Sequence, residues 1–386
     1  MMVFEEFGSS LSEICSRSPL AQGRPLLWTI IANPKAGGYA IKSRWKKHQA
    51  MLEECVKKAK NNPLRNDAGP SKTALREGGE TGTLGLVLTR AAGHAGEITA
   101  ALLKEAADAD TKADLAAETS RPFYLIICAG GDGTSLEVLT ALYHAPAELR
   151  ENFVVSRLPM GTGNDGSDTW ELDDSLKLIM ERAKLKKQRA LKLSTSSGKG
   201  PFLAFNILSV GLDAFVTHMT NKMKGKLPGD SYKLWVDLAS LFYDRIYKVG
   251  YMEVHARDEG GKEVKALKEK LLLLAVGESG RRSYGSHNWI LPDERNVCAL
   301  KQMPLIRKLA LKNLFAYGTH IDKPEAILWN AQTVEFSSQY PLLAQMDGET
   351  VLLEGKDFPA AIELTEPVIP MLEIGMRNSE FTNIFP

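Results

Sequence analysis

Residues 129–135, Ala-Gly-Gly-Asp-Gly-Thr-Ser, constrain the fold more than any other stretch of the chain. They follow the uninterrupted apolar run 123–128, which is typical of a strand buried on both faces of a parallel sheet. Beyond them, apolar residues recur at helical spacing as far as Leu142, so the stretch joins a strand to the start of a helix. Glycines let a backbone approach a ligand closely, and the free N–H groups at a helix N-terminus bind anions. The stretch therefore predicts a phosphate site, the alternative being a tight turn capped by Asp132.

Other polar turns also follow predicted strands. Thr89 ends the predicted strand 84–89, and two glycine-containing turns follow the apolar runs 26–32 and 153–158. Because the carboxyl ends of parallel strands meet at one edge of a sheet, we expect these turns to line a single crevice. Asp132 would bring a carboxylate close to phosphate, so we expect a cation between the two. The two glycine turns are Asn33-Pro34-Lys35-Ala36-Gly37-Gly38 and Pro159-Met160-Gly161-Thr162-Gly163-Asn164-Asp165.

Composition narrows the class of protein. The 386 residues include 48 Lys and Arg against 47 Asp and Glu, so no overall field favours nucleic acid. At 44% hydrophobic, the chain can bury the cores of two domains. The four cysteines lack paired spacing, which argues against a disulfide framework and against a zinc site. With no apolar run long enough to span a membrane and no secretory leader, we expect a cytoplasmic protein that touches a membrane only from outside.

The pattern changes after the basic segment 184–189, which we interpret as a link between domains. Before it, strands alternate with amphipathic helices, which predicts an α/β domain. After it, short alternating runs predict an antiparallel, sandwich-like β domain interrupted by helices at 234–247 and 304–317. The predicted domains are 1–188 and 189–386, with the option that the last residues return to the first domain.

Taken together, the motifs resemble the diacylglycerol kinase catalytic family, which includes bacterial lipid kinases, sphingosine kinases and ceramide kinases. They run in the family's order over residues 26–375 and as a set are highly specific. The matching segments are the two glycine turns above, Thr89 with Gly93-His94-Ala95, Gly130-Gly131-Asp132-Gly133-Thr134 with Glu137-Val138, Phe205-Asn206-Ile207-Leu208-Ser209-Val210-Gly211-Leu212-Asp213-Ala214, Tyr317-Gly318-Thr319-His320 and Asp347-Gly348-Glu349.

The resemblance implies a three-layer N-terminal α/β domain, related to the NAD-kinase and phosphofructokinase folds, and a C-terminal β-sandwich domain. It also implies ATP between the domains, Mg²⁺ held at Asp132, and a base at Asp347 or Glu349 that deprotonates the substrate hydroxyl. Asp-Gly alone is a strong turn signal, so without the resemblance a plain β-turn would be preferred. The positions implied at the nucleotide are Asn33, Pro34, Lys35, Gly37, Thr89, Gly130, Gly131, Asp132, Gly133, Thr134, Ser135, Glu137, Gly161, Thr162, Asn164 and Asp165.

Several positions depart from the family pattern. Leu136 stands where the family usually has Asn, and Lys192 lies where a strand commonly carries Asp. The family's triple glycine is reduced to Tyr284-Gly285-Ser286, and its metal-carrying Asp-Asp-Gly segment is represented by Asp293-Glu294-Arg295-Asn296. These departures leave the structural metal and the identity of the lipid open.

The sequence favours an ATP-dependent lipid kinase that transfers the γ-phosphoryl group to a hydroxyl of a diacylglycerol-like or sphingoid lipid. The implied partners are ATP, a lipid substrate and a membrane surface contacted through the basic stretches 184–189 and 222–226, with homodimer formation left open. Two alternatives remain. One is an NAD kinase-type phosphotransferase, which shares Gly-Gly-Asp-Gly-Thr, and the other is a non-catalytic nucleotide-binding regulatory protein.

Overall fold

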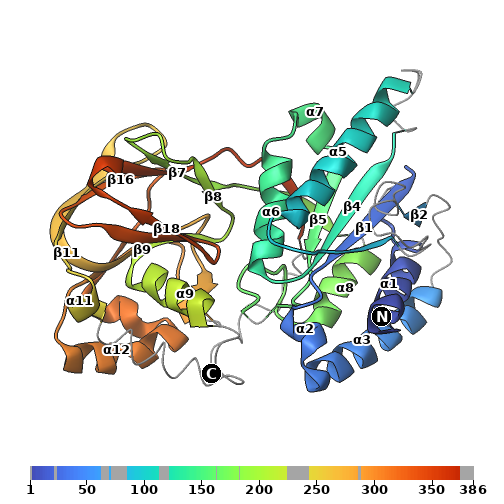
Figure 1. Ribbon diagram of the computed structural model, residues 1–386, viewed down its shortest axis with the longest axis horizontal. Coiled ribbons are helices and arrows are strands. Elements are labelled where there is room, and N and C mark those ends of the chain that lie inside the picture. The colour runs from blue at the N-terminus through green and yellow to red at the C-terminus, as the bar shows by residue number, and fades with distance from the viewer. Residues whose placement is uncertain are drawn as a thin grey trace. The chain divides into compact units, whose positions relative to one another are not determined.

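The computed structural model describes residues 2–20, 24–61, 69–70, 85–112, 121–161, 163–181, 183–223, 243–285 and 288–373. Contacts between residues divide the chain into two compact units. Unit 1 comprises the residues up to Gln188 and those from Val368 onward. Unit 2 is Arg189–Pro367, inserted between these two parts. Unit 1 is α/β and unit 2 is an antiparallel β structure with helices, which confirms the predicted fold class (Figure 1).

A seven-stranded sheet forms the centre of unit 1, in the order β2-β1-β4-β5-β20-β6, with β3 also paired to β1. β1, β4 and β5 are parallel neighbours and are almost wholly buried, as their apolar sequences predict. β6 is antiparallel to β20 and lies at the edge of the sheet. The strands are β1 (Leu26–Ala32), β2 (Gly69–Pro70), β3 (Leu86–Leu88), β4 (Phe123–Ala129), β5 (Phe153–Arg157), β6 (Lys184–Gln188) and β20 (Ile369–Glu373).

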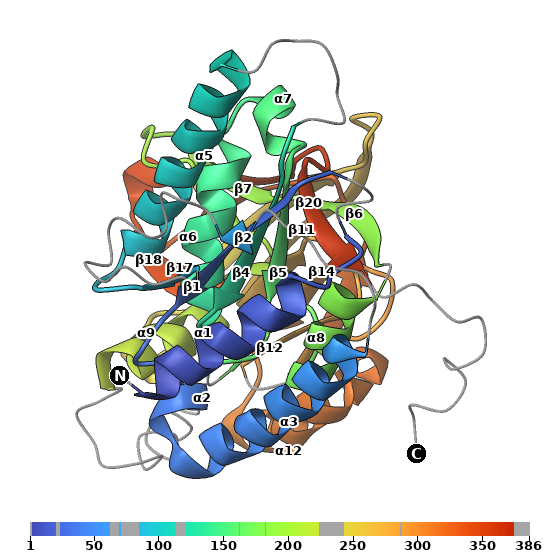
Figure 2. The same ribbon diagram turned by 90° about the vertical axis from the view of Figure 1, so that its right-hand side faces the viewer.

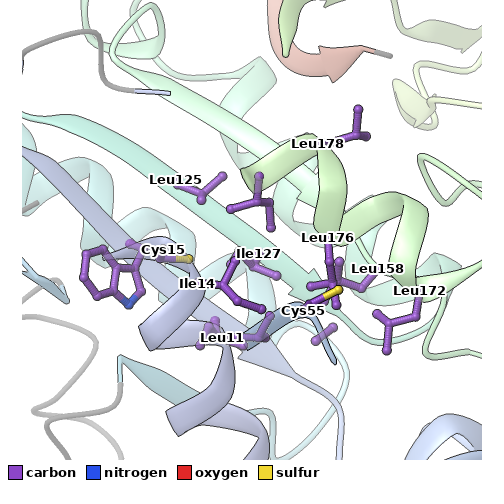
Figure 3. Close-up of a cluster of buried hydrophobic side chains, with 14 of the residues drawn as sticks. Leu11, Ile14, Cys15, Cys55, Leu125, Ile127, Leu158, Leu172, Leu176 and Leu178 are labelled. Carbon is purple, nitrogen blue, oxygen red and sulfur yellow. The ribbon is translucent and has the colours of Figure 1, made fainter. Parts of the chain in front are cut away.

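Helices cover both faces of this sheet. α1, α3 and α8 pack together on one face, and α5 and α6 pack together on the other (Figure 2). In the first layer, Leu11 and Ile14 of α1 and Leu176 of α8 meet Leu125 and Ile127 of β4 (Figure 3). The helices are α1 (Met2–Cys15), α2 (Gly37–Ala40), α3 (Lys42–Lys60), α5 (His94–Lys112), α6 (Asp132–Tyr143), α7 (Ala147–Arg150) and α8 (Leu172–Met180).

Unit 2 is built around the 15-residue strand β11. The first half of β11 pairs with β10, and its second half pairs with β9 and β14, so one strand belongs to both layers of the unit. Val254, Val276 and Phe336 lie in the apolar core that both layers share. The strands are β7 (Leu191–Thr195), β8 (Phe202–Ala204), β9 (Ile207–Gly211), β10 (Tyr251–Arg257), β11 (Glu263–Gly277), β12 (Arg282–Tyr284), β13 (Asn288–Leu291), β14 (Val297–Lys301), β15 (Ala326–Trp329), β16 (Thr333–Ser338), β17 (Leu342–Met346), β18 (Glu349–Leu353) and β19 (Ala360–Leu364).

Helices pack on the outer face of β9, β11 and β14. Phe215 and Tyr243 lie in a second apolar core there, together with Leu273 and Cys298 of the strands. These helices are α9 (Leu212–Met223), α11 (Tyr243–Ile246) and α12 (Leu305–Tyr317), followed by the short helices η2 (Thr319–Asp322) and η3 (Gly355–Asp357). The expected helix at 304–317 is confirmed as α12, whereas most of the expected helix at 234–247 lies outside the described residues.

One expectation about local structure is wrong. The basic segment 184–189, interpreted as a link, forms strand β6 over Lys184–Gln188, because β20 returns from the far end of the chain to pair with it. Among the helices in the described parts of the chain, none is long and apolar enough to cross a bilayer.

His320 of η2 is fully buried in unit 2. Its ring stacks on Phe315 of α12 with the centroids 4.1 Å apart, and neither ring nitrogen has a hydrogen-bond partner among the described residues. Burial disfavours the charged imidazolium and lowers the pKa of His320 to about 4.

The titration of His320 should therefore appear in the stability of the protein. The unfolded histidine has a pKa near 6.5, so between about 6.5 and 4 the unfolded state binds the proton more readily than the folded state. The free energy of unfolding should therefore decrease as the pH is lowered from about 6.5 to about 4, by up to about 3 kcal/mol from His320 alone. His320→Leu should flatten this slope in urea unfolding followed at several pH values. An unchanged slope in that variant would show that the buried ring does not titrate in this way.

Candidate functional site

Three backbone hydrogen bonds bring the predicted turns to one edge of the sheet in unit 1. The N–H of Asn33 donates to the carbonyl of Ala129 at 3.1 Å, just past the ends of β1 and β4. The N–H of Thr89 donates to the carbonyl of Ala32 at 2.9 Å, just past the end of β3. The N–H of Leu158, just past the end of β5, donates to the carbonyl of Cys128 in β4 at 2.9 Å. The four carboxyl ends are therefore neighbours, as the parallel arrangement predicts.

The Gly130-Gly131 turn leads directly into α6. Gly131 is the N-cap residue in extended backbone, and no side chain caps the helix. The N–H groups in the first turn of a helix lack partners within the helix and carry its positive dipole, so this position favours a negative charge. Gly130 leaves room for Thr134, because a Cβ on Gly130 would collide with the Thr134 side chain.

The third turn packs against this one through glycine. A Cβ on Gly161 would lie 2.7 Å from the Cα of Gly131 and 2.9 Å from Oδ1 of Asn164, closer than real Cβ atoms approach. Asn164 has φ of 60° and donates from Nδ2 to the carbonyl of Pro159 at 3.2 Å, which closes the turn on itself. Thr162, the central residue of this turn, lies outside the described residues. The absence of side chains on Gly131 and Gly161 therefore lets the two backbones meet.

Two carboxylates point toward Gly163. Oδ2 of Asp165 and Oδ2 of Asp132 lie 3.0 Å and 3.4 Å from the position a Cβ on Gly163 would occupy. Oδ1 of Asp132 accepts the N–H of Gly166 at 2.9 Å, so this carboxylate is held against the loop. Carboxylate oxygens are the ligands that Mg²⁺ prefers, alongside phosphate oxygens and water. The donor set therefore fits a Mg²⁺ ion shared with a phosphate, although the described residues contain no cluster of three or more side chains able to hold a metal by themselves.

The first turn, at residues 33–38, is also fixed by its own backbone. Oδ1 of Asn33 accepts the N–H of Lys35 at 3.0 Å, and the N–H of Gly38 donates to the carbonyl of Met160 at 2.8 Å. A Cβ on Gly38 would lie 2.9 Å from that carbonyl oxygen, so glycine allows this approach. Lys35 is exposed and Gly37 is buried.

Glu137 of α6 fixes the neighbouring turn at the start of α5 through two hydrogen bonds. Its Oε1 accepts the N–H of Gly93 at 2.7 Å, and its Oε2 accepts the N–H of Ala95 at 2.9 Å. A carboxylate at this point stabilises the N-terminus of α5. Nδ1 of His94 accepts the N–H of Arg90 at 3.1 Å in the same turn. Both residues therefore position the turn that follows Thr89.

One supporting pair was missed by the sequence analysis. Arg157 at the end of β5 forms a nearly buried ion pair with Asp168, with Nε and Oδ1 2.9 Å apart, and the Arg157 N–H donates to Oδ2 of the same carboxylate at 2.7 Å. The pair closes the loop that contains Gly161 and Asp165. Its charges are separated by ten residues of loop and follow no motif, so the sequence carried no signal for it.

The acidic turn of unit 2, Asp347-Gly348-Glu349, joins β17 to β18. Asp347 has φ of 46° and is 6% exposed. Its carboxylate accepts the backbone N–H groups of Phe205, of Asn206 at 3.0 Å and of Ile207 at 3.0 Å, where β8 leads into β9. Glu349, in contrast, is exposed and has no partner among the described residues. The two carboxylates predicted as one site thus have different surroundings.

Polar side chains surround this turn on the side of α9. Gln345 of β17 donates to Ser209 at 3.0 Å and to Asp213 at 3.3 Å, and its Oε1 accepts the N–H of Gly348 at 3.2 Å. Asn221 donates to the carbonyl of Gly348 at 2.7 Å. The Asp213 motif and the acidic turn, more than 130 residues apart in sequence, therefore form one polar cluster in unit 2.

The departures from the family pattern also have local partners. Arg295 binds Asp293 through two nitrogens, Nε and Nη2, and this contact lowers the pKa of the Asp293 carboxyl. Lys192 pairs with Glu363 of β19 at 3.1 Å. The Asp293 carboxylate, which lies where the resemblance implies a structural metal, is therefore bound by the Arg295 guanidinium.

Residues 27–195 match the family model described as the diacylglycerol kinase catalytic domain. This segment is similar to diacylglycerol kinase catalytic domains. It includes every described turn at the carboxyl edge of the unit 1 sheet and ends within β7, so the match rests on the glycine turns and not on the acidic turn.

Named relatives are similar to part of this chain. Over 108 residues the chain is 32% identical to proteins of Enterobacter sp. (strain 638) and Yersinia pestis (strain Pestoides F), each named "Probable lipid kinase YegS-like". The matched segment is 28% of this chain and 35% of each relative, so the chain spans about a third of the length of the curated relatives it matches.

Solved structures share the fold. Two structures of a "putative diacylglycerol kinase" from Bacillus anthracis str. Sterne superpose with TM-scores of 0.53 and 0.52 at 19% sequence identity. The likeness covers 90% of this chain and 98% and 97% of those chains, so it extends over both units.

The surroundings of Asp347 generate a stability prediction. Asp347→Asn turns an NH₂ group toward backbone N–H groups that now donate to the carboxylate, and two donors cannot hydrogen-bond each other. We expect the free energy of unfolding to fall by about 1–3 kcal/mol. Glu349→Gln, two residues away and exposed, is the matched control and should leave it unchanged. Urea unfolding of both variants measures the difference, and equal stability would mean that the three amides contribute nothing.

Proposed function

We propose that the protein is an ATP-dependent lipid kinase that transfers the γ-phosphoryl group to a hydroxyl of a diacylglycerol-like or sphingoid lipid. The observation that carries the proposal is the meeting of Gly131, Gly161 and Gly163 beside the carboxylates of Asp132 and Asp165. Backbone donors for phosphate and carboxylates for a cation are the parts that phosphoryl transfer requires. The match to the kinase domain and the names of the relatives support the same reaction class.

In this proposal the phosphates lie over the Gly130-Gly131 turn, where peptide N–H groups and the start of α6 neutralise negative charge. Asn33, Thr89 and the Gly161 turn complete the surface around the nucleotide. Bound Mg²⁺ would neutralise charge on the phosphates from the side of Asp132 and Asp165. Gly166 and the Arg157–Asp168 pair hold these carboxylates in place, so their positions are set before ATP arrives.

The acidic turn is the proposed source of the base. Asp347 has both oxygens committed to backbone N–H groups, so few lone pairs remain to accept a proton. Glu349 is exposed and unpaired among the described residues, which leaves its carboxylate free to accept the proton of the lipid hydroxyl. We therefore propose Glu349 as the base and Asp347 as the residue that fixes the turn.

ATP binding tests the nucleotide part. A side chain at Gly131 enters the proposed phosphate surface, and its Cβ would meet only the Cα of Gly161, at an ordinary 3.8 Å, so the fold should survive Gly131→Val. We expect ATP binding to be lost in calorimetric titration, with the circular dichroism spectrum retained. Gly96→Ala, whose Cβ makes an ordinary 3.5 Å contact, is the control and should bind ATP as the parent protein does. Unchanged ATP affinity in a folded Gly131→Val protein would overturn this site.

Turnover tests the base. Glu349→Gln should lower kcat on a lipid substrate by about 10²-fold or more, with ATP affinity and stability unchanged. The assay uses labelled ATP with a panel of diacylglycerols and sphingoid bases. If Glu349→Gln keeps its turnover while a folded Asp347→Asn protein loses it, the base is Asp347. Phosphate transfer to NAD in place of every lipid would contradict the lipid kinase itself.

We also propose that the protein works from the cytoplasm at a membrane surface, where its lipid resides. Of the basic stretches expected to contact lipid, 184–187 is an exposed part of β6, and 222–226 lies mostly outside the described residues.

A further inference from the structure

Arg157 at the end of β5 contributes a guanidinium group to the edge of the sheet where the glycine turns meet. Its side chain is nearly buried, and its Nη1 atom lies 4.0 Å from the position that a Cβ on Gly166 would occupy. Oδ1 of Asp132 lies 3.3 Å from the same position and accepts the Gly166 N–H. The guanidinium is therefore a close neighbour of the carboxylate proposed to hold a cation beside the phosphates.

Arg157 binds its carboxylate partner through one nitrogen of the guanidinium. Nε donates to Oδ1 of Asp168 at 2.9 Å, while Oδ2 accepts the backbone N–H of Arg157 at 2.7 Å. Arg307 instead binds Glu325 through Nε and Nη2 together, at 2.6 Å and 3.0 Å, which is the bidentate arrangement that arginine favours with carboxylates. Asp168 thus fixes the guanidinium at Nε and does not occupy its Nη1 and Nη2 groups.

Both Nη groups of Arg157 remain available for a ligand. Neither forms a hydrogen bond with a residue in the described parts of the chain, and neither is wholly closed off from solvent. Charged donors without acceptors in a nearly buried side chain are costly, so the arrangement favours an anion that enters from solvent. Guanidinium groups bind phosphate through paired N–H donors, and Asp168 already orients this one, so little ordering remains to be done on binding.

We propose that Arg157 binds the phosphates of the nucleotide through Nη1 and Nη2 while Asp168 holds its Nε. The inference rests on the proposed function, which supplies the nucleotide, and it adds a side-chain donor to the backbone donors of the glycine turns. Positive charge from arginine is one of the means by which proteins accelerate phosphoryl transfer. The pair with Asp168 therefore has a second task besides closing the loop, because it positions a charge for the phosphates.

Two variants separate the guanidinium from the ion pair. Asp168→Asn breaks the charge pair but keeps Arg157, and the double variant Arg157→Leu with Asp168→Asn also removes the guanidinium. Removing Arg157 by itself would leave Asp168 as a buried, unpaired charge and endanger folding, which the double variant avoids. Circular dichroism and urea unfolding check that both variants are folded, and their comparison then depends on Arg157 alone. Arg157→Lys, in which an ammonium group replaces the planar guanidinium, is a milder variant for the same measurement.

Nucleotide binding measures the contact with phosphate. In calorimetric titration, the double variant should bind ATP about tenfold to 10²-fold more weakly than Asp168→Asn, which is the usual worth of a hydrogen bond to a charged group. Both variants should bind adenosine, which has no phosphate, with equal affinity, and Arg157→Lys should show a smaller loss for ATP alone. A loss confined to ATP supports the proposal, because a structural disturbance would weaken adenosine as well. Equal ATP affinity in the two variants, or a parallel loss for ATP and adenosine, would overturn it.

Activity separates this inference from the lipid kinase proposal. If the double variant shows the selective loss of ATP affinity but the unaltered protein phosphorylates no lipid, the kinase proposal fails and the phosphate contact stands. If the unaltered protein phosphorylates lipid and the double variant equals Asp168→Asn in ATP affinity and in kcat, the role of Arg157 fails alone. If the unaltered protein binds no ATP, the nucleotide site and the role of Arg157 fail together.

Discussion

The parallel register of β1, β4 and β5 is the constraint on which the nucleotide part of the structure depends. It pairs Ala32 with Ala129 and Cys128 with Arg157, so the chain leaves three strands at the same level. The turns that follow can then contact one another through Gly131, Gly161 and Gly38. A shift in this register would separate the glycines, and the peptide groups proposed to bind phosphate would no longer face a common point.

The parts of this arrangement that were predictable are those encoded locally. The apolar runs preceding Asn33, Gly130 and Pro159 predicted buried parallel strands, and their ends predicted the shared edge. The return of β20 to unit 1 was predicted only as an option, because the sequence of a five-residue strand does not indicate which sheet it joins. The Arg157–Asp168 pair and the amides bound to Asp347 depend on tertiary contacts, which periodicity does not reveal.

Asp347 shows how a recognised motif can hold residues with different tasks. In sequence, the two carboxylates of Asp-Gly-Glu look equivalent. In the structure, the Asp347 carboxylate binds the backbone between β8 and β9, whereas the Glu349 side chain is exposed to solvent. A left-handed Asp347 followed by Gly348, with φ of 103°, bends the chain sharply enough to separate them. The same turn therefore joins stability and proposed chemistry within three residues.

The path of the chain through unit 1 has a consequence for synthesis on the ribosome. Unit 2 is an insertion between β6 and β20, and β6 pairs only with β20 among the described strands. During synthesis β6 therefore has no strand to pair with until about 180 residues of unit 2 have left the ribosome and β20 follows. Three of its five residues are lysines, and lysine on an unpaired strand discourages pairing with other chains. The basic segment can thus protect the nascent protein from aggregation until its last strand arrives.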